Sequence, residues 1–257
     1  MNRQQFQLIL VGLIVVLTVS VHAKDVSYMI ENNPKCTQKR LEQTEMAVAK
    51  MIGFGKHGRK FPDTYEKISL YCKETTRLVA QTESFTKECI RKDVADLLSV
   101  ILYSVKSHLI RQYCGKSRTN KRVTSMVRTS PCVNEHLLPN DHCVRQFINS
   151  TIPLITLEKD NMKIPYTCCN YVKTMGCFEK MIESQTCLKQ HRERIIEIIK
   201  GLFNGVTDIM CGEYNEGTDK CEKLPPIPRT NKVAKRNYQT FMFLLADVLS
   251  SSKGFKE

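Results

Sequence analysis

Residues 72–114 read CKETTRLVAQTESFTKECIRKDVADLLSVILYSVKSHLIRQYC, and residues 169–211 read CNYVKTMGCFEKMIESQTCLKQHRERIIEIIKGLFNGVTDIMC. Both stretches begin and end with a cysteine, at a separation of 42 residues. Each has a further cysteine, Cys89 or Cys187, just before a long amphipathic run. A feature that recurs at one fixed spacing indicates an internal repeat. We therefore predict two diverged copies of one unit, with coincidence between two cysteine-rich helical stretches as the alternative.

Both stretches have the apolar spacing of a helix face. Apolar residues recur every three or four positions, first at 90, 94, 97, 98, 101, 105 and 109 and then at 188, 195, 196, 199, 203, 206 and 210. A shorter helix is predicted from about Asp63, with Asp63 as N-cap, Glu66 in a capping box and Phe61 as a staple. Alternating strand patterns are nearly absent. The fold class is therefore predicted to be all-α, a helical array pinned by disulfides.

The chain has twelve cysteines, all after residue 23. An even number behind a secretory leader predicts six disulfides, whereas a metal site would favour C-x₂-C pairs that this sequence lacks. When the two copies are aligned, Cys36 loosely matches Cys143, and Cys132 matches Cys221. Ala80 then occupies the position that corresponds to Cys177. One disulfide redirected between the copies is then expected, but spacing alone does not give the connectivity. The cysteines are Cys36, Cys72, Cys89, Cys114, Cys132, Cys143, Cys168, Cys169, Cys177, Cys187, Cys211 and Cys221.

The chain begins like a signal peptide. Arg3 precedes an apolar run at 8–19, and Val21-His22-Ala23 matches the small-x-small cleavage pattern. The run is shorter than the roughly 20 residues that span a bilayer, which favours cleavage over an uncleaved anchor. The predicted organisation is a signal peptide (1–23), a first helical cysteine-rich repeat (24–139), a second (140–222), and a basic, proline-containing linker with an apolar C-terminal helix (223–257).

The C-terminal helix is expected within the apolar stretch 238–249. It follows Leu224-Pro225-Pro226-Ile227-Pro228, which cannot continue a helix because proline lacks an N–H. Packing on the core is favoured over a membrane-binding or partner-binding role. The polar end at 250–257 is unlike a GPI signal, which terminates in a hydrophobic tail.

Positive charge dominates the chain, which carries a net +13, or about +12 without Arg3 of the leader. No acidic residue lies between Asp96 and Glu135. The candidate anion-binding residues in this interval are Lys116, Arg118, Lys121 and Arg122. They are predicted to bind an anionic glycan or membrane surface, with a solvated loop and helix face as the alternative. Nucleic acid is not an expected partner, because aromatic residues for base stacking are not interleaved among the cations.

No catalytic or cofactor motif stands out. The doublet Cys168-Cys169 with Cys177 resembles secreted phospholipase A2, but Asn170 to Lys173 follow where that enzyme needs a histidine. The doublet is better explained as two bridges that leave one helix in different directions. His136 and His142 near Asp141 lack helical metal-ligand spacing, so no metal is expected. The sequence therefore predicts a protein that is not an enzyme and has no cofactor.

Asn149-Ser150-Thr151 is the sequon for N-glycosylation, which predicts a glycan on a surface loop or turn.

The order of these features resembles the insect 27 kDa haemolymph glycoprotein family and related secreted arthropod proteins. The resemblance covers about 30–222 and departs from the family pattern at Ala80. It implies a glycosylated helical protein that circulates in body fluid, without established catalytic residues. The features that carry it are Tyr71-Cys72, Phe85-x₃-Cys89, Tyr113-Cys114, Pro131-Cys132, the segment from Cys143 to Asn149, the step from Cys177 to Cys187, and the long helix before Cys211.

The expected function is a secreted, non-enzymatic extracellular glycoprotein of haemolymph or another body fluid that acts by binding. Two alternatives remain at this point. One is a carrier of a small apolar ligand between its helices. The other is a venom or salivary component that binds anionic membranes or glycans through its excess positive charge. The sequence leaves the oligomeric state undetermined.

Overall fold

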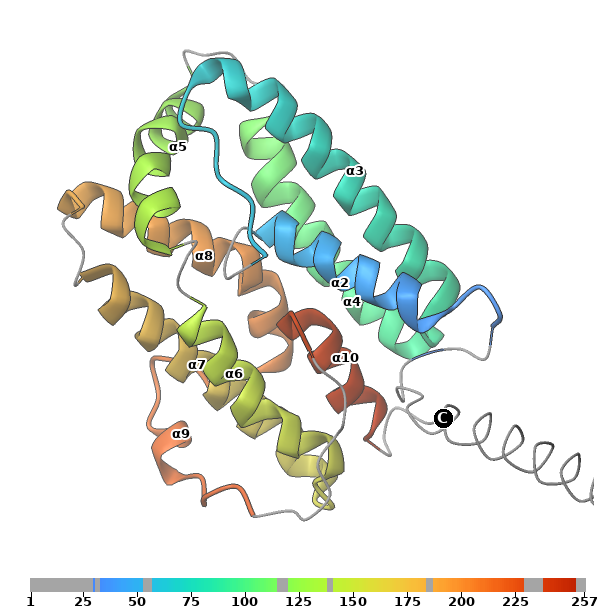
Figure 1. Cartoon of the computed structure of the whole chain (residues 1–257). Helices are drawn as coiled ribbons and strands as arrows, with labels where there is room; N and C mark the ends of the chain where they lie inside the picture. The colour runs from blue at the N-terminus through green and yellow to red at the C-terminus, as the bar shows by residue number, and fades with distance from the viewer. Residues whose placement is uncertain are drawn as a thin grey trace, which may run out of the picture.

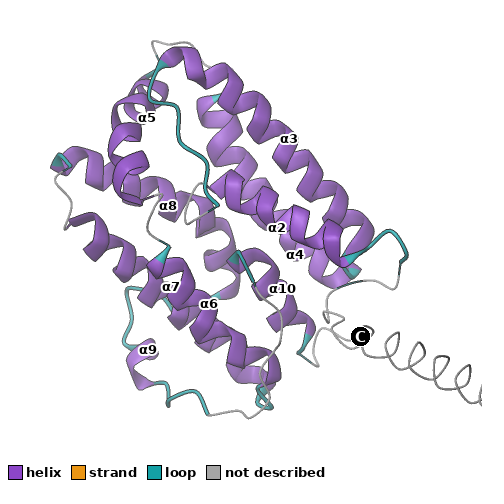
Figure 2. Ribbon diagram, viewed as in Figure 1, coloured by secondary structure: helices purple, strands orange, loops and turns teal. Residues whose placement is uncertain are grey.

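The computed structural model describes residues 30, 33–52, 57–114, 120–137, 141–183, 187–228 and 238–252. These segments form an array of helices (Figures 1 and 2), and their extended pairing is limited to a bridge between Ile30 and Ile90. The predicted disulfide-pinned all-α fold is confirmed. The predicted signal peptide at 1–23 lies outside the described residues. The helical elements are α2 (Gln38–Ile52), α3 (Tyr65–Cys89), α4 (Lys92–Val105), η1 (Lys106–Arg111), α5 (Lys121–Cys132), η2 (Val133–Leu137), α6 (His142–Thr151), η3 (Ile152–Thr156), α7 (Asp160–Glu183), α8 (Lys189–Met210), α9 (Lys220–Lys223) and α10 (Phe241–Ser250).

One succession of helices occurs twice in the described chain. We call α2, α3 and α4 with η1 the first unit, and α6, α7 and α8 the second unit; each is a shorter helix followed by two long ones. In each unit, one bridge joins the start of the first helix to the second helix, and another joins the second helix to the end of the third. The bridges are Cys36–Cys89 and Cys72–Cys114 in the first unit, and Cys143–Cys177 and Cys168–Cys211 in the second. This parallel is what a duplicated helical unit would leave.

The remaining bridges show where the two units diverge. Cys132 of α5 pairs with Cys187, just before α8, so one bridge joins the two halves of the chain. Cys169 of α7 pairs with Cys221 of α9. The register aligned Cys89 with Cys187, but only Cys89 bonds within its own unit. The register also aligned Cys72 with Cys169, but the bond to Cys211 is made by the neighbouring Cys168. The predicted register is therefore wrong about bonding at both Cys187 and Cys169.

Helix α3 is longer than the sequence predicted. Its N-cap is Thr64, whose side chain makes no capping hydrogen bond, and the helix runs without a break to Cys89. The prediction of Asp63 as N-cap is therefore wrong. Asp63 instead pairs with Lys67 across one turn, at 2.6 Å between Oδ1 and Nζ. In a capping box, the Asp63 carboxylate would instead accept a hydrogen bond from the backbone N–H of Glu66.

The main apolar core is shared by the two units, and a smaller cluster lies between α6, η3, α7 and α10. Helix α4 packs against α8, and the main cluster of buried apolar residues extends from Leu41 of α2 to Ala246 of α10. Contact between α8 and η1 is close at Gly201, where a Cβ atom would lie 2.7 Å from Cδ2 of His108. A larger residue at this position would therefore require the His108 ring to move. The predicted domain boundary at 139–140 falls between η2 and α6, but the core continues across it.

The C-terminal apolar stretch folds back on the core, as predicted. Helix α10, red in Figure 1, packs against α4, α6, α7 and η3. Met242, Phe243 and Leu244 are at most 1% exposed. The edge of Phe243 contacts the ring of Phe85 in α3, with the ring centroids 5.8 Å apart. This helix is therefore part of the folded body.

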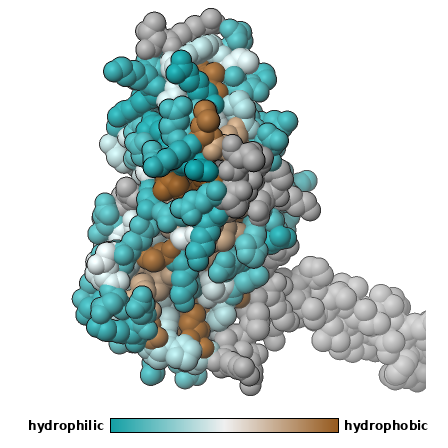
Figure 3. All heavy atoms as spheres, turned by 90° about the vertical axis from the view of Figure 1, so that its left-hand side faces the viewer, coloured by the Kyte–Doolittle hydropathy of each residue, from teal (hydrophilic) through white to brown (hydrophobic). Residues whose placement is uncertain are grey.

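Apolar side chains reach the surface only in small, separate patches on the face shown in Figure 3, where hydrophilic residues surround them. Helices long and apolar enough to cross a bilayer do not occur in the described segments.

Candidate functional site

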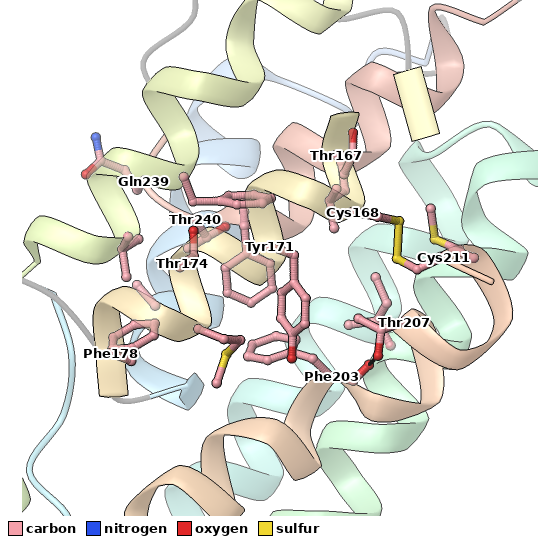
Figure 4. Close-up of a pocket in the computed structure, with 18 residues that line it drawn as sticks. Thr167, Cys168, Tyr171, Thr174, Phe178, Phe203, Thr207, Cys211, Gln239 and Thr240 are labelled. Carbon is pink, nitrogen blue, oxygen red and sulfur yellow. Dashed lines mark hydrogen bonds between the residues drawn. A yellow bond between two sulfur atoms is a disulfide. The ribbon is translucent and has the colours of Figure 1, made fainter. Parts of the chain in front are cut away.

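A cavity of about 80 Å³ lies where α6, α7, α8 and α10 meet over residues of α2 and α4 (Figure 4). One water requires roughly 10–15 Å³ measured in the same way, so the space exceeds a single solvent molecule several times. Its walls are overwhelmingly apolar. The lining residues are Ala49, Ile101, Val144, Phe147, Thr167, Cys168, Tyr171, Thr174, Met175, Phe178, Phe203, Thr207, Met210, Cys211, Gln239, Thr240, Phe241 and Leu245.

The cavity has a buried floor and a half-buried aromatic rim. Ile101 and Met175 belong to the floor and are 3% and 1% exposed. At the rim, the rings of Phe203 and Phe241 meet edge to face with centroids 4.5 Å apart, and Tyr171 lies 6.0 Å from Phe203. Aromatic pairs in this geometry attract one another beyond their simple burial. The rim is therefore an ordered apolar surface that solvent can reach.

Helix α7 contributes most of the wall, and the cysteine doublet fixes its position. Cys168 bonds to Cys211 at the end of α8, whereas its neighbour Cys169 bonds to Cys221 of α9. The prediction that this doublet sends two bridges in different directions from one helix is confirmed. On the same helix, the Asn170 side-chain amide donates to the backbone carbonyl of Ser150, at 3.0 Å. This bond joins α7 to α6, on the adjacent wall.

Helix α10 closes the cavity and is anchored by hydrogen bonds at its C-terminal end. Lys163 of α7 is 2% exposed, and its ammonium group donates to the carbonyl oxygen and the hydroxyl of Ser251 at 3.0 and 2.9 Å. The same ammonium pairs with Asp160 at 3.0 Å. Before the helix, the Tyr238 hydroxyl donates to the Asp247 carboxylate at 2.6 Å. A buried lysine needs such partners, because an unpaired charge is costly in the interior.

Four threonines line the cavity, and their hydroxyls fall into two classes. Those of Thr174 and Thr207 donate to backbone carbonyls one turn earlier in their own helices. Those of Thr167 and Thr240 are buried and have no hydrogen-bond partner among the residues that the structure describes. In Figure 4 the Thr167 oxygen points away from the rings, whereas Thr240 lies beside them. Thr240 is the N-cap residue of α10, yet its side chain makes no capping bond.

The electrostatic surroundings of the cavity differ from those of the whole chain. None of the lining residues that the structure describes is a lysine, arginine or histidine, although the chain carries a net charge of +13. Burial raises the pKa of the Tyr171 phenol, and the carboxylates of Glu216 and Asp208 raise that pKa further. Lys200 offsets part of this negative charge, since its ammonium lies 2.8 Å from Glu216.

We compared the chain with protein-family models, curated proteins and solved structures. None of them matches it. The resemblance to the haemolymph glycoprotein family therefore stays a prediction. What the cavity can bind follows only from the residues around it.

The structure describes two of the four predicted anion-binding residues. Lys116 and Arg118 lie outside the described residues, while Lys121 and Arg122 are exposed in the first turn of α5. The N-cap residue Asn120 accepts a hydrogen bond from the backbone N–H of Arg122 at 3.0 Å. Two cations thus lie at a helix N-terminus, without an acidic residue in that turn. Anion binding there stays a prediction.

The predicted glycosylation site lies on a helix. Asn149 is exposed as expected, but it belongs to α6, so the prediction of a loop or turn is wrong. The helix continues because Phe147, Ile148 and Thr151 on its other face are buried. Occupancy of Asn149 by a glycan stays a prediction.

Histidines do not gather into a site in the described part of the chain. No group of three His, Cys, Asp or Glu side chains there is close enough to hold a metal ion. His142 is exposed at the start of α6, while His108 packs against Gly201 between η1 and α8.

Sequence reasoning did not single out the cavity residues. Phe203 belonged to the predicted apolar face of one helix, and Phe241 to the apolar C-terminal stretch. Periodicity marks such residues as buried, but it does not distinguish a filled core from the wall of a cavity.

Proposed function

We propose that this chain is a secreted, non-enzymatic binding protein that carries a small apolar ligand in the cavity between α6, α7, α8 and α10. The observation that carries the proposal is the cavity itself, with its apolar walls and its aromatic rim. Sites for small molecules typically combine apolar walls with a few polar groups that orient the ligand. Of the functions expected from the sequence, the carrier is the one that this geometry supports best.

Secretion is part of this proposal and is supported by the cysteines. All twelve are paired and none is free, a pattern typical of chains that mature in an oxidising compartment. The leader at 1–23 and the exposed sequon at Asn149 agree with export. A glycoprotein of haemolymph or a similar body fluid would meet these conditions.

Binding to an anionic glycan or membrane surface is a second candidate function. It is favoured by the exposed pair Lys121 and Arg122, which adds its charge to the positive end of the α5 dipole. Neither residue lines the cavity, so the two functions can be tested separately. Retention on heparin that falls with salt would indicate it.

A cavity-filling substitution tests the carrier function. Val144 of α6 is half-buried in the cavity wall, so Val144→Phe should place a ring in the space that a ligand needs. Binding of N-phenyl-1-naphthylamine, a neutral apolar probe, is measured by fluorescence titration of the secreted protein. We expect the wild type to bind the probe and Val144→Phe to bind at least about tenfold more weakly, which corresponds to roughly 1.4 kcal/mol.

The matched control is Val172→Phe. Val172 is a similarly half-buried valine on α7, but it does not line the cavity. Its substitution should leave probe affinity within about twofold. Equal losses in both variants, or no saturable binding by the wild type, would rule out this cavity as the carrier site. Native mass spectrometry of the protein from its source gives an independent reading, since a carried molecule is extra mass that is lost on denaturation.

A further inference from the structure

A further hollow, which we call the α6–α7 groove, lies between two helices that run side by side in Figure 1. We propose that this groove binds a sulfated glycan chain, whose sulfate groups pair with Lys173 and Lys180 of α7. The proposal goes beyond the carrier function, because no residue that lines this groove also lines the apolar cavity. It also differs from the second candidate function, which places an anion at Lys121 and Arg122 of α5.

The α6–α7 groove is an open space of about 610 Å³ whose two walls are joined by a disulfide. The bridge between Cys143 and Cys177 lines the groove and fixes α6 against α7 at this point. Two polar side chains, His142 and Gln146, line it from α6, and the two lysines line it from α7. No acidic residue lines the groove in the described chain. Cations in such a cleft concentrate the electric field and attract anions more strongly than they would on a flat surface.

Lys173 and Lys180 have no partner within the described part of the protein. Residues seven positions apart lie on the same side of a helix, about 10 Å apart along its axis. Both lysines are exposed, and neither makes an ion pair or a hydrogen bond with a described residue. By contrast, Lys163 of the same helix and Lys200 of α8 are both ion-paired with carboxylates. The two ammonium groups of the groove are therefore available to an anionic ligand.

Gly176 leaves the space between these lysines open. It lines the groove three residues after Lys173 and four residues before Lys180, on the same face of α7. A Cβ atom at Gly176 would have no atom of another side chain within 4 Å. An anionic group can therefore lie over this glycine, near both ammonium groups, without displacing a side chain.

The shape of the hollow favours a chain-like ligand over a membrane surface. A neighbouring hollow of about 400 Å³, bordered by residues 224–227, shares Gln146 and Lys173 with the groove, and no acidic residue lines it in the described segments. A flexible chain can follow two hollows that meet, whereas the surface of a bilayer cannot enter a groove between two helices. Between the sulfates, sugar hydroxyls can form hydrogen bonds with His142 and Gln146.

The test is binding of a fluorescently labelled heparin hexasaccharide to the secreted full-length protein, measured by fluorescence anisotropy. The salt is kept at about 50 mM NaCl, where screening of charges is weak. We expect the double variant K173A/K180A to bind the hexasaccharide at least about fivefold more weakly than the wild type does. The matched control is K73A/K87A, which removes two exposed lysines from α3, the equivalent helix of the first unit. Its affinity should stay within about twofold of the wild type, because exposed charges far from the ligand are screened.

A second variant tests the groove without changing its charge. Gly176→Leu keeps both lysines but places a side chain in the space between them, so it should weaken binding at least about threefold. Gly176→Ala is its control, because it adds only a methyl group and should bind nearly as the wild type does. Thermal melting of each variant verifies that it is folded.

Several results would overturn the proposal. Equal losses in K173A/K180A and K73A/K87A would assign binding to the overall positive charge, and unchanged binding by Gly176→Leu would place the ligand outside the groove. A loss confined to K121A/R122A would assign the glycan to the α5 pair instead. Displacement of the hexasaccharide by vesicles that contain phosphatidylserine would identify a membrane as the occupant. Absence of binding by the wild type would also refute the proposal, while binding of N-phenyl-1-naphthylamine tests the carrier function independently.

Discussion

The two three-helix units have the same helix order and matching disulfides, but the packing between their helices differs. In the first unit, Leu78 and Phe85 of α3 and Leu98 of α4 are at most 1% exposed and belong to a packed core. In the second unit, Met175 and Ile199 belong to the same core, but a cavity also lies between its helices, and α10 closes it from outside the unit. Equivalent bridges hold both. Disulfides at helix ends restrain the chain without dictating the interior, so one framework can hold either a core or a cavity.

Removal of matched bridges is the strongest test of this equivalence. Cys36–Cys89 and Cys143–Cys177 close loops with sequence separations of 53 and 34 residues. Loop entropy predicts that each bridge stabilises the fold by about 4 kcal/mol, with a difference below about 0.5 kcal/mol. We expect the double variants C36A/C89A and C143A/C177A to lose similar free energies of unfolding in denaturant titrations.

Ligand binding should distinguish these two variants even where stability does not. Loss of Cys143–Cys177 loosens α6 against α7 in the cavity wall, so affinity for N-phenyl-1-naphthylamine should fall. Loss of Cys36–Cys89 should leave it nearly unchanged at temperatures where the protein is folded. Equal effects on affinity would mean that the two units do not behave as separate frameworks.

Alkaline titration compares one tyrosine from each unit, the buried Tyr71 and the half-buried Tyr171. Burial raises the pKa of Tyr71 from 10.0 to about 12, although the Arg59 guanidinium opposes this, and burial also raises the pKa of Tyr171. Between pH 10 and 12 folded Tyr71 keeps a proton that the unfolded chain loses, so stability falls as the pH rises. The loss attributable to Tyr71 reaches up to about 3 kcal/mol near pH 12.

Absorbance of tyrosinate and unfolding in denaturant between pH 8 and 11 measure this effect. Tyr71→Phe should flatten the decline, because its phenol no longer titrates in the unfolded chain. A bound ligand should change the titration of Tyr171 at the cavity rim and leave that of Tyr71 unaltered. An unchanged alkaline slope in Tyr71→Phe would show that burial of this phenol does not control stability there.

Two glycines of the second unit test its junction with the first. A Cβ at Gly201 would lie 2.7 and 2.9 Å from ring atoms of His108, so Gly201→Ala should destabilise the fold by about 1–3 kcal/mol. Gly176 of α7 has no atom within 4 Å of its Cβ position, and Gly176→Ala should stabilise the helix by up to about 1 kcal/mol. Thermal melts should therefore shift in opposite directions. A shift in the same direction would mean that the His108 ring can move away from Gly201 without loss of stability.

Much of the fold could be predicted from the sequence, because helix periodicity and cysteine number are local properties. The amphipathic run after Cys187 is α8, and the run after Cys89 is α4 continued by η1. The apolar C-terminal stretch was correctly expected to pack on the core. The cysteine pairing could not be predicted, since spacing does not fix connectivity. It depends on which helices meet, and that is a long-range property.

The cavity lay beyond prediction for a related reason. Its lining comes from six helices and from the segment before α10, so no local pattern marks it. The Thr240 hydroxyl has no hydrogen-bond partner within the described segments, and a sequence does not show which buried groups lack partners. The prediction of a loop at Asn149 was wrong because it used the sequon alone. The sequon lies in α6, whose opposite face is buried at Phe147 and Ile148.

The connectivity of the bridges also bears on how the chain matures. None of the six joins two cysteines that are consecutive in the sequence. In the proposed export the chain would emerge N-terminus first, so the earliest thiols able to meet, Cys36 and Cys72, would be wrong partners for each other. Cys132 must wait until Cys187 has emerged, while four other thiols appear between them. We therefore expect a disulfide isomerase to improve the yield of this protein, and a host that oxidises thiols in order of appearance to accumulate scrambled forms.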